Sequence, residues 1–181
     1  MPFFSGLTED SGVRDILAMN PAAGRALIEY HEVVLRGPSP LSVAERELIA
    51  AYVSGLNGCH YCHGVHAVTA EAFGIPATLM KSLLDDPETA DVDPKLKPLL
   101  AYARKLTLTP ARMTEADAKA VYAAGWTEKA LHDACSVCCL FNFMNRLLDG
   151  HGVHGNDSVY QRRGQMLKDD GYAPLIKLLG G

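Results

Sequence analysis

The sequence predicts an all-α protein of about eight helices, arranged as a single domain with two helical halves. Two observations carry this prediction. Residues that start and stop helices recur along the whole chain, and stretches that alternate apolar with polar residues, as strands do, are few. The composition agrees with one compact soluble domain, because 48% of the 181 residues are hydrophobic and 21% are charged.

Paired start and stop signals delimit the expected helices. Asn20 and Pro21 open the first, as an N-cap followed by proline at the first helical position, and Gly37 ends it. Ser42 and Glu45 form a capping box at the start of the next. The same reasoning predicts helices over residues 21–36, 43–55, 59–73, 76–84, about 94–108, 115–125, 128–149 and 157–170, followed by a short tail helix.

Two segments are expected to lie outside these helices. Residues 85–94 are acidic and contain proline, so we expect them to link the two halves. Residues 1–10 are expected to form a flexible N-terminus. The single domain is expected to cover residues 1–181.

Charge and hydropathy exclude several classes of protein. The net charge is −4 and no run of Lys and Arg forms a basic stripe, which argues against nucleic acid and anionic membranes as partners. The most apolar stretch, residues 134–144, is far shorter than the roughly 20 residues that span a bilayer. The first twelve residues lack the basic and apolar regions of a signal peptide. We therefore expect a cytoplasmic protein whose five cysteines are free thiols.

The most informative motif is a C-x-x-C pair at the expected start of a helix. If the helix begins at residue 57 or 58, Cys59 lies in its first turn and Cys62 one turn later on the same face. The helix N-terminus favours an anion and lowers the pKa of a thiol from about 8.5. His66 follows Cys62 by four residues, close enough to accept its proton. These residues predict a redox site in which Cys62 is ionised.

A carboxylate upstream completes the candidate site. The helical neighbours of Glu47 are all small or apolar: Val43, Ala44, Ala50, Ala51 and Ser54. A carboxylate on such a face is costly unless it is paired, and burial raises its pKa into a range suited to proton relay. Glu45, by contrast, has a structural role in the capping box. Glu47 is therefore the functional candidate.

Three other interpretations of the motif stay open. Residues 59–63 satisfy the C-x-x-C-H pattern of c-type haem attachment, although that attachment belongs to exported proteins. The sequence His-Gly-Val-His occurs at 63–66 and again at 151–154, which suggests metal ligands, but the flanking sequences differ. The cysteines can also serve packing alone. We expect neither a cofactor nor a metal.

A second group of thiols has a different setting. Cys135, Cys138 and Cys139 lie in the middle of an expected helix among apolar residues, with no helix N-terminus to acidify them. Buried free cysteine usually behaves as a small hydrophobic residue, and we expect that role here. Arg146, in the same helix, is expected to form an ion pair, line a pocket or lie on the surface.

The spacing of these residues resembles a known family. Glu47, Cys59, Cys62 and His66, separated by eleven, two and three residues, match the signature of the alkylhydroperoxidase D-like (AhpD-like) branch of the carboxymuconolactone decarboxylase family. The resemblance extends over about residues 22–153 and includes features of a peroxidase-related subgroup. Supporting matches lie at residues 41–47, 73–75, 125–127 and 141–146.

The resemblance implies an activity and a role for each residue. It implies an all-α homo-oligomer (a dimer, trimer or hexamer) that reduces hydroperoxides and is itself re-reduced by a dithiol or lipoyl-type donor. By position, Cys62 is the peroxidatic thiol, Cys59 the resolving thiol, His66 the base and Glu47 its relay partner. Tyr61 stands where better-studied members carry a relay histidine.

Accessory residues and other functions accompany this hypothesis. Tyr61, His63 and Arg146 are the accessory candidates. A carboxymuconolactone decarboxylase-like enzyme, which needs no thiols, and a non-catalytic thiol redox sensor are the alternatives. The paired cysteines favour the thiol-dependent peroxidase over both.

Overall fold

The structure is a computed structural model that describes residues 1–180, and within them every regular element is a helix. The all-α prediction is therefore confirmed, with ten α-helices where about eight were expected. One 3-10 turn, η1, also forms. The elements are α1 (Val13–Ala18), α2 (Pro21–Arg36), α3 (Val43–Leu56), α4 (His60–Ala72), α5 (Ala77–Asp85), α6 (Lys97–Leu108), η1 (Pro110–Arg112), α7 (Glu115–Ala123), α8 (Glu128–His151), α9 (Asp157–Asp169) and α10 (Ala173–Gly180).

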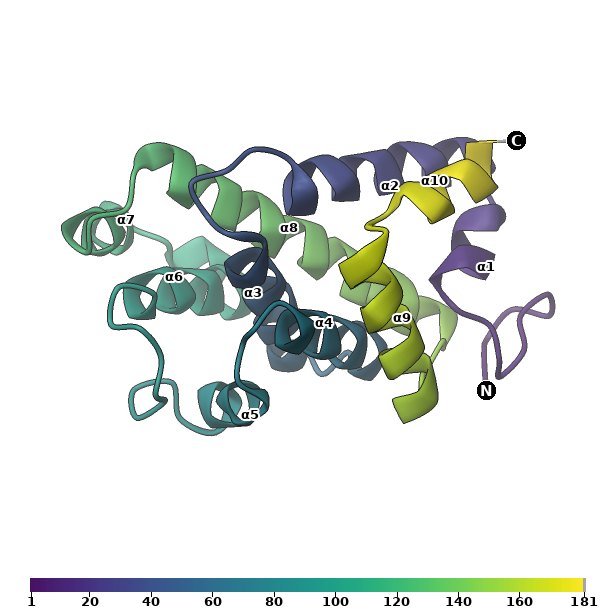
Figure 1. Cartoon of the computed structure of the whole chain (residues 1–181), viewed down its shortest axis with the longest axis horizontal. Coiled ribbons are helices and arrows are strands. Elements are labelled where there is room, and N and C mark those ends of the chain that lie inside the picture. The colour runs from purple at the N-terminus through teal and green to yellow at the C-terminus, as the bar shows by residue number, and fades with distance from the viewer. Residues whose placement is uncertain (181) are drawn as a thin grey trace.

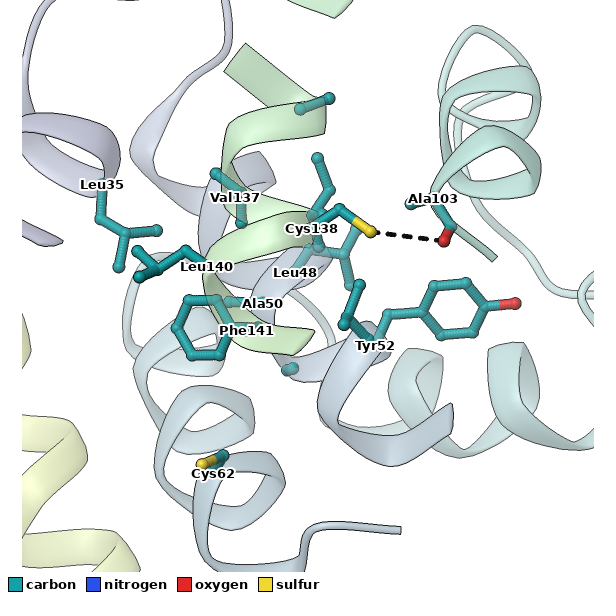
Figure 2. Packing of buried hydrophobic residues seen from close by; sticks show 14 of the residues in the cluster. Leu35, Leu48, Ala50, Tyr52, Cys62, Ala103, Val137, Cys138, Leu140 and Phe141 are labelled. Atoms are coloured by element: carbon teal, nitrogen blue, oxygen red, sulfur yellow. Dashed lines mark hydrogen bonds between the residues drawn. The ribbon is translucent and has the colours of Figure 1, made fainter. Parts of the chain in front are cut away.

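Helix α3 lies at the centre of the molecule. Residues 46–54 of this helix are all buried, and α3 packs against α4, α5, α6 and α8 (Figure 1). A helix that is buried all round must be apolar on nearly every face, which is why Glu47 is surrounded by small and apolar neighbours. Figure 2 shows the packing of this core, in which side chains of α3 such as Leu48 meet Val137 and Phe141 of α8. The core thus encloses Glu47.

The capping signals work as the sequence predicts at α2 and α3. The Asn20 side chain accepts a hydrogen bond from the backbone of Ala23 at 3.3 Å. Ser42 Oγ accepts one from the Glu45 backbone at 3.2 Å, and the Glu45 carboxylate accepts one from the Ser42 backbone at 2.6 Å. Each bond satisfies a donor that a helix start leaves without a partner. The structural role of Glu45 is confirmed.

The end of α8 differs from the prediction. Gly150 was expected to stop the helix after residue 149, but α8 continues to His151. The stop is Gly152, which adopts a left-handed conformation with φ of 67°. A helix tolerates glycine in a right-handed turn, and the residue that leaves the helix at positive φ ends it.

The start of α4 also differs by one residue. Cys59 is the N-cap, in an extended conformation, and α4 begins at His60. Gly58 precedes it with φ of 71°, which reverses the chain between α3 and α4. Cys59 therefore lies just outside the first helical turn, and Cys62 lies inside it.

The segments outside the expected helices are packed against the core. In the segment between α5 and α6, Ala90 and Val92 are buried. Near the N-terminus, the Phe4 ring stacks on His151 at 4.5 Å between centroids, and the backbone of Phe3 donates to the carbonyl of His151 at 3.0 Å. Both segments thus contact the helical body.

Helices α9 and α10 cover the face of the molecule that carries the candidate site. Helix α9 packs along α4, while α10 packs on α2 and also contacts α1 (Figure 1). Among residues 1–180, no helix is both long enough and apolar enough to cross a membrane.

Candidate active site

The two cysteines of the C-x-x-C motif lie together at the start of α4. Cys59 is fully buried and Cys62 is 5% exposed, and both are free thiols. The two thiols are close enough for Cys59 to shift the pKa of Cys62. The expected proximity of the pair is confirmed, because the chain reversal at Gly58 places the N-cap thiol beside the thiol one turn later.

The charge state of Cys62 contradicts the prediction of an ionised thiol. Its hydrogen bond with Cys59, its burial and the electrostatic influence of Cys59 together raise the pKa of Cys62 well above the ordinary value. A hydrogen bond from Asn145 works in the opposite direction but is weaker. The interaction with Cys59 and desolvation of the thiolate together outweigh the helix N-terminus, and Cys62 is a neutral thiol that needs a base.

His66 is bound to Glu47, as its place in the motif predicts. The Nδ1 atom of His66 lies 2.6 Å from Oε2 of Glu47, and the carboxylate is fully buried. A hydrogen bond from Nδ1–H to a carboxylate fixes the tautomer of the ring and leaves Nε2 as the proton acceptor. His66 is therefore oriented to act as a base through Nε2.

Glu47 is an ionised carboxylate, which corrects the expectation of a raised pKa. Burial alone raises its pKa, but the charge and hydrogen bond of His66 and the charge and hydrogen bond of Arg36 outweigh burial and place the pKa below its ordinary value. An acid that stays ionised does not shuttle protons at neutral pH. Glu47 instead holds His66 in place and fixes the tautomer of its ring.

Arg36 is a member of the site that sequence reasoning missed. Its Nη1 atom lies 2.6 Å from Oε1 of Glu47, so the buried carboxylate is paired on both oxygens. The backbone carbonyl of Leu167 accepts a hydrogen bond from Nη2 at 3.0 Å. Arginine in the last turn of a helix is common because it suits the helix dipole, so nothing in the sequence distinguished Arg36.

Asn145 is a second residue that the sequence did not single out. This buried side chain of α8 donates to Ser54 Oγ at 2.9 Å and accepts from the side chain of Asn57 at 2.9 Å. It also lowers the pKa of the Cys62 thiol. The network ties the end of α3, the start of α4 and the middle of α8 together around the thiol. A polar residue on an apolar helix face was the only signal for it.

A cavity of about 60 Å³ adjoins these groups. Cys62 and His66 both line it, and most of the remaining wall is apolar. His31, which carried no signal in the sequence, also lines it, and burial lowers the pKa of His31 to about 4 although its ring is bonded to the Leu27 carbonyl. The other lining residues are Val13, Ile28, Tyr61, Val65, Phe141, Met144, Leu148, Arg163, Met166, Leu167, Gly171, Tyr172 and Leu175.

The structure separates the three accessory candidates. Tyr61 lines the cavity, is 5% exposed and has its pKa raised by burial. His63 faces α3, where its Nδ1 atom lies 3.0 Å from the carbonyl oxygen of Ala51. Arg146 is exposed and donates to the carbonyl of Asn142 at 2.6 Å. Only Tyr61 of the three belongs to the lining of this cavity.

The cysteines of α8 have three different environments. Cys138 is buried, as a small core residue should be, and its thiol donates to the carbonyl of Ala103 at 3.5 Å (Figure 2). It also lies 3.3 Å from Thr107 Oγ1. Burial raises the pKa of Cys138 and of the half-buried Cys135 to about 11. Cys139, however, is exposed, which differs from the expected burial because it falls on the solvent side of the helix.

The repeated His-Gly-Val-His sequence does not form one site. His66 binds Glu47, whereas His151 stacks on Phe4 and lies 2.7 Å from the Leu147 carbonyl oxygen. Within residues 1–180, no group of three or more His, Cys, Asp or Glu side chains is placed to hold a metal ion.

Comparison with known proteins relates this site to one family. The sequence model of the carboxymuconolactone decarboxylase family matches residues 21–105, which include Glu47, Cys59, Cys62 and His66. No curated protein matches the sequence.

Solved structures support the same relationship. An uncharacterized peroxidase-related protein from Silicibacter sp. TM1040 is 27% identical, with a TM-score of 0.76 over 84% of this chain and 79% of that one. An AhpD-core, peroxidase-related protein from Ralstonia eutropha JMP134 is 26% identical, with a TM-score of 0.75 over 82% and 78% of the two chains.

A more distant structure shares the fold alone. A variant of the debrominase Bmp8, in complex with 2,3,4-tribromopyrrole, is 13% identical, with a TM-score of 0.68 over 92% of this chain and 81% of that one. The protein therefore has the AhpD-like fold of the two nearer structures, and its residues 21–105 match the carboxymuconolactone decarboxylase family.

Proposed function

We propose that the protein is a thiol-dependent hydroperoxide reductase. The observation that supports it best is the meeting of two kinds of group at one cavity. One is the Cys62 thiol, which interacts with Cys59, and the other is His66, a histidine held by a buried, ionised carboxylate. A thiol with a high pKa next to an oriented base is suited to proton transfer during attack on a substrate.

The proposed reaction begins at Cys62. His66 accepts its proton at Nε2, and the sulfur attacks the terminal oxygen of the hydroperoxide, so that an S–O bond forms and the O–O bond breaks. The departing alkoxide takes the proton from His66 and leaves as an alcohol. Glu47 and Arg36 take no proton, and their role is to keep the imidazole in place and to stabilise its charged form.

The second half of the reaction uses Cys59. Its sulfur attacks the sulfenic acid at Cys62, an S–S bond forms, and the hydroxyl group leaves with the Cys59 proton as water. An external dithiol or lipoyl-type donor then reduces the disulfide by thiol–disulfide exchange. The influence of Cys59 on the pKa of Cys62 shows that the two thiols interact, which supports this step.

Hydroperoxide consumption in the presence of a dithiol tests the proposal. The unmodified protein should sustain turnover with cumene hydroperoxide and dihydrolipoamide. Cys62→Ser should abolish it, since no sulfur is left to attack. Cys59→Ser should allow a single oxidation of Cys62, which a sulfenic-acid probe captures.

The matched control is Cys139→Ser, the same change at an exposed thiol outside the site, which should leave turnover intact. Equal activity of Cys62→Ser and the unmodified protein would contradict the proposal. One stoichiometric oxidation without turnover would instead indicate the redox sensor.

The setting of this reaction also stays a prediction. We propose a cytoplasmic homo-oligomer that acts on a small hydroperoxide and binds neither nucleic acid nor membranes. Sedimentation velocity of the purified protein distinguishes a monomer from a dimer, trimer or hexamer.

A further inference from the structure

Tyr172 carries a buried hydroxyl group without a hydrogen-bond partner. It lies in the turn between α9 and α10, is 4% exposed, and its ring packs 5.3 Å from that of His31. A buried polar group without a partner costs about 1–3 kcal/mol, so such a group calls for a functional explanation. A bound molecule with an oxygen atom would supply the missing acceptor.

The position of Tyr172 shows where that molecule would bind. Tyr172 lines the same cavity as Cys62 and His66, and the charge of Glu47 acts on its hydroxyl. Arg163 lines this cavity too, and its Nε atom also lacks a partner. The apolar wall therefore carries two donors without acceptors.

The turn that carries Tyr172 is fixed before any molecule binds. Its backbone N–H donates to the Glu32 carboxylate at 2.9 Å, and Gly171 adopts φ of 60° beside the same carboxylate. The ring also packs against the Arg36 guanidinium, 5.5 Å away. Burial and the nearby carboxylate of Glu47 raise the pKa of Tyr172 well above 10, so the group is a permanent donor at neutral pH.

We propose that the Tyr172 hydroxyl donates a hydrogen bond to the departing oxygen of the hydroperoxide as the O–O bond breaks. This inference rests on the proposed function. When the Cys62 sulfur attacks the terminal oxygen, negative charge develops on the oxygen bonded to carbon. Tyr172 stabilises that charge without losing its proton, and His66 supplies the proton that completes the alcohol.

The test is Tyr172→Phe, with the rate of Cys62 oxidation measured in single turnover. Removing one donor to a developing oxyanion lowers a rate by about 10²-fold. We expect a loss of this size with tert-butyl hydroperoxide, whose alkoxide is a poor leaving group. The loss should be several-fold smaller with peracetic acid, because the departing acetate stabilises its own charge. Alkylation of Cys62 by iodoacetamide, which needs no donor to oxygen, should keep its rate.

Tyr52→Phe is the matched control. Its hydroxyl is also buried without a partner, but Tyr52 lies on α3 outside the cavity lining and points away from Cys62 in Figure 2. This variant should oxidise at the rate of the unmodified protein with both peroxides.

Three outcomes overturn the inference, and they separate it from the proposed function. An undiminished rate in Tyr172→Phe overturns the inference alone. Equal losses with both peroxides and with iodoacetamide show that Tyr172 only supports the shape of the site, which also overturns it. If neither peroxide oxidises the unmodified protein, the proposed function and the inference are overturned together.

Discussion

The charge state of each group in the site depends on its partners more than on its place in a helix. Cys62 lies in the first turn of α4, where the helix dipole favours an anion, yet burial and its contact with Cys59 raise its pKa. Glu47 is more deeply buried, yet its pKa falls because His66 and the charged Arg36 both pair with its carboxylate. In its resting state the site is therefore a neutral thiol beside a charged group, the Glu47–Arg36 ion pair, which we call the anchor.

The anchor gives a prediction at Arg36. Arg36→Gln removes the positive charge from Oε1 of Glu47, so the pKa of Glu47 should rise and its protonation should begin at a higher pH. The acid limb of the pH profile for Cys62 oxidation should move to higher pH. The free energy of unfolding should fall by about 3 kcal/mol, because a buried charge loses one partner.

The control for this prediction lies on the same helix. Arg25→Gln makes the same change at an exposed pair with Glu29, where an ion pair contributes about 0–1 kcal/mol. A pH-dependent oxidation assay and urea unfolding measure both effects. An acid limb that stays in place in Arg36→Gln would show that Glu47 does not need Arg36 to remain ionised.

At the scale of elements, the site depends on how closely α9 approaches α4. The two helices meet at glycines from both sides: a Cβ atom at Gly64 would lie 2.5 Å from the ring of Tyr160, and one at Gly164 would lie 2.5 Å from the Val68 side chain. Small residues let helix backbones pack closely. Because α9 carries Arg163, this contact sets one wall of the cavity.

Replacing one of these glycines should separate the helices. Gly64→Ala should lower the free energy of unfolding by about 1–3 kcal/mol, because the added methyl group overpacks the contact with Tyr160. Gly150→Ala is the control, since Gly150 is exposed within α8 and has open space around its Cα. That variant should gain about 0.5–1 kcal/mol from helix propensity. Urea unfolding measures both, and equal stability of Gly64→Ala and the unmodified protein would contradict the close contact.

At the scale of the whole molecule, segments far apart in sequence enclose the site. The family match ends at residue 105, but α8, α9 and the turn before α10 supply much of the cavity wall. Helix α2, which lies beside α10 (Figure 1), contributes His31 and Arg36. Folding of the C-terminal part is therefore required to complete a site whose motif lies in the first half of the chain.

Burial of His31 in this enclosure predicts an acid-sensitive protein. Its pKa is about 4 in the folded state and about 6.5 in an unfolded chain, so the unfolded state binds a proton first as the pH falls. The contribution of His31 to stability is complete above pH 6.5 and is lost between pH 6.5 and 4, by up to about 3 kcal/mol.

Urea unfolding at a series of pH values measures this loss. His31→Gln, which is neutral throughout, should flatten the dependence between pH 6.5 and 4. His132→Gln, at an exposed position of α8, should keep it. The same slope in both variants would assign the acid sensitivity to other groups.

The sequence by itself determined the helices and the core members of the site. A cap such as Ser42 with Glu45 forms between residues within one helical turn, so the start of a helix can be predicted from neighbouring residues alone. The same holds for the spacing of Cys59, Cys62 and His66 along one helix, and the apolar face around Glu47 indicated its burial.

Only the tertiary structure decided which partners surround these residues and which of them carry charge. Arg36, Asn145 and Tyr172 come from three other segments, and none stands out in the sequence. The pKa of a buried group follows from desolvation and from charges within a few ångströms, which long-range packing brings together. For that reason the motif alone misjudged the charge state of Cys62 and the direction of the pKa shift of Glu47.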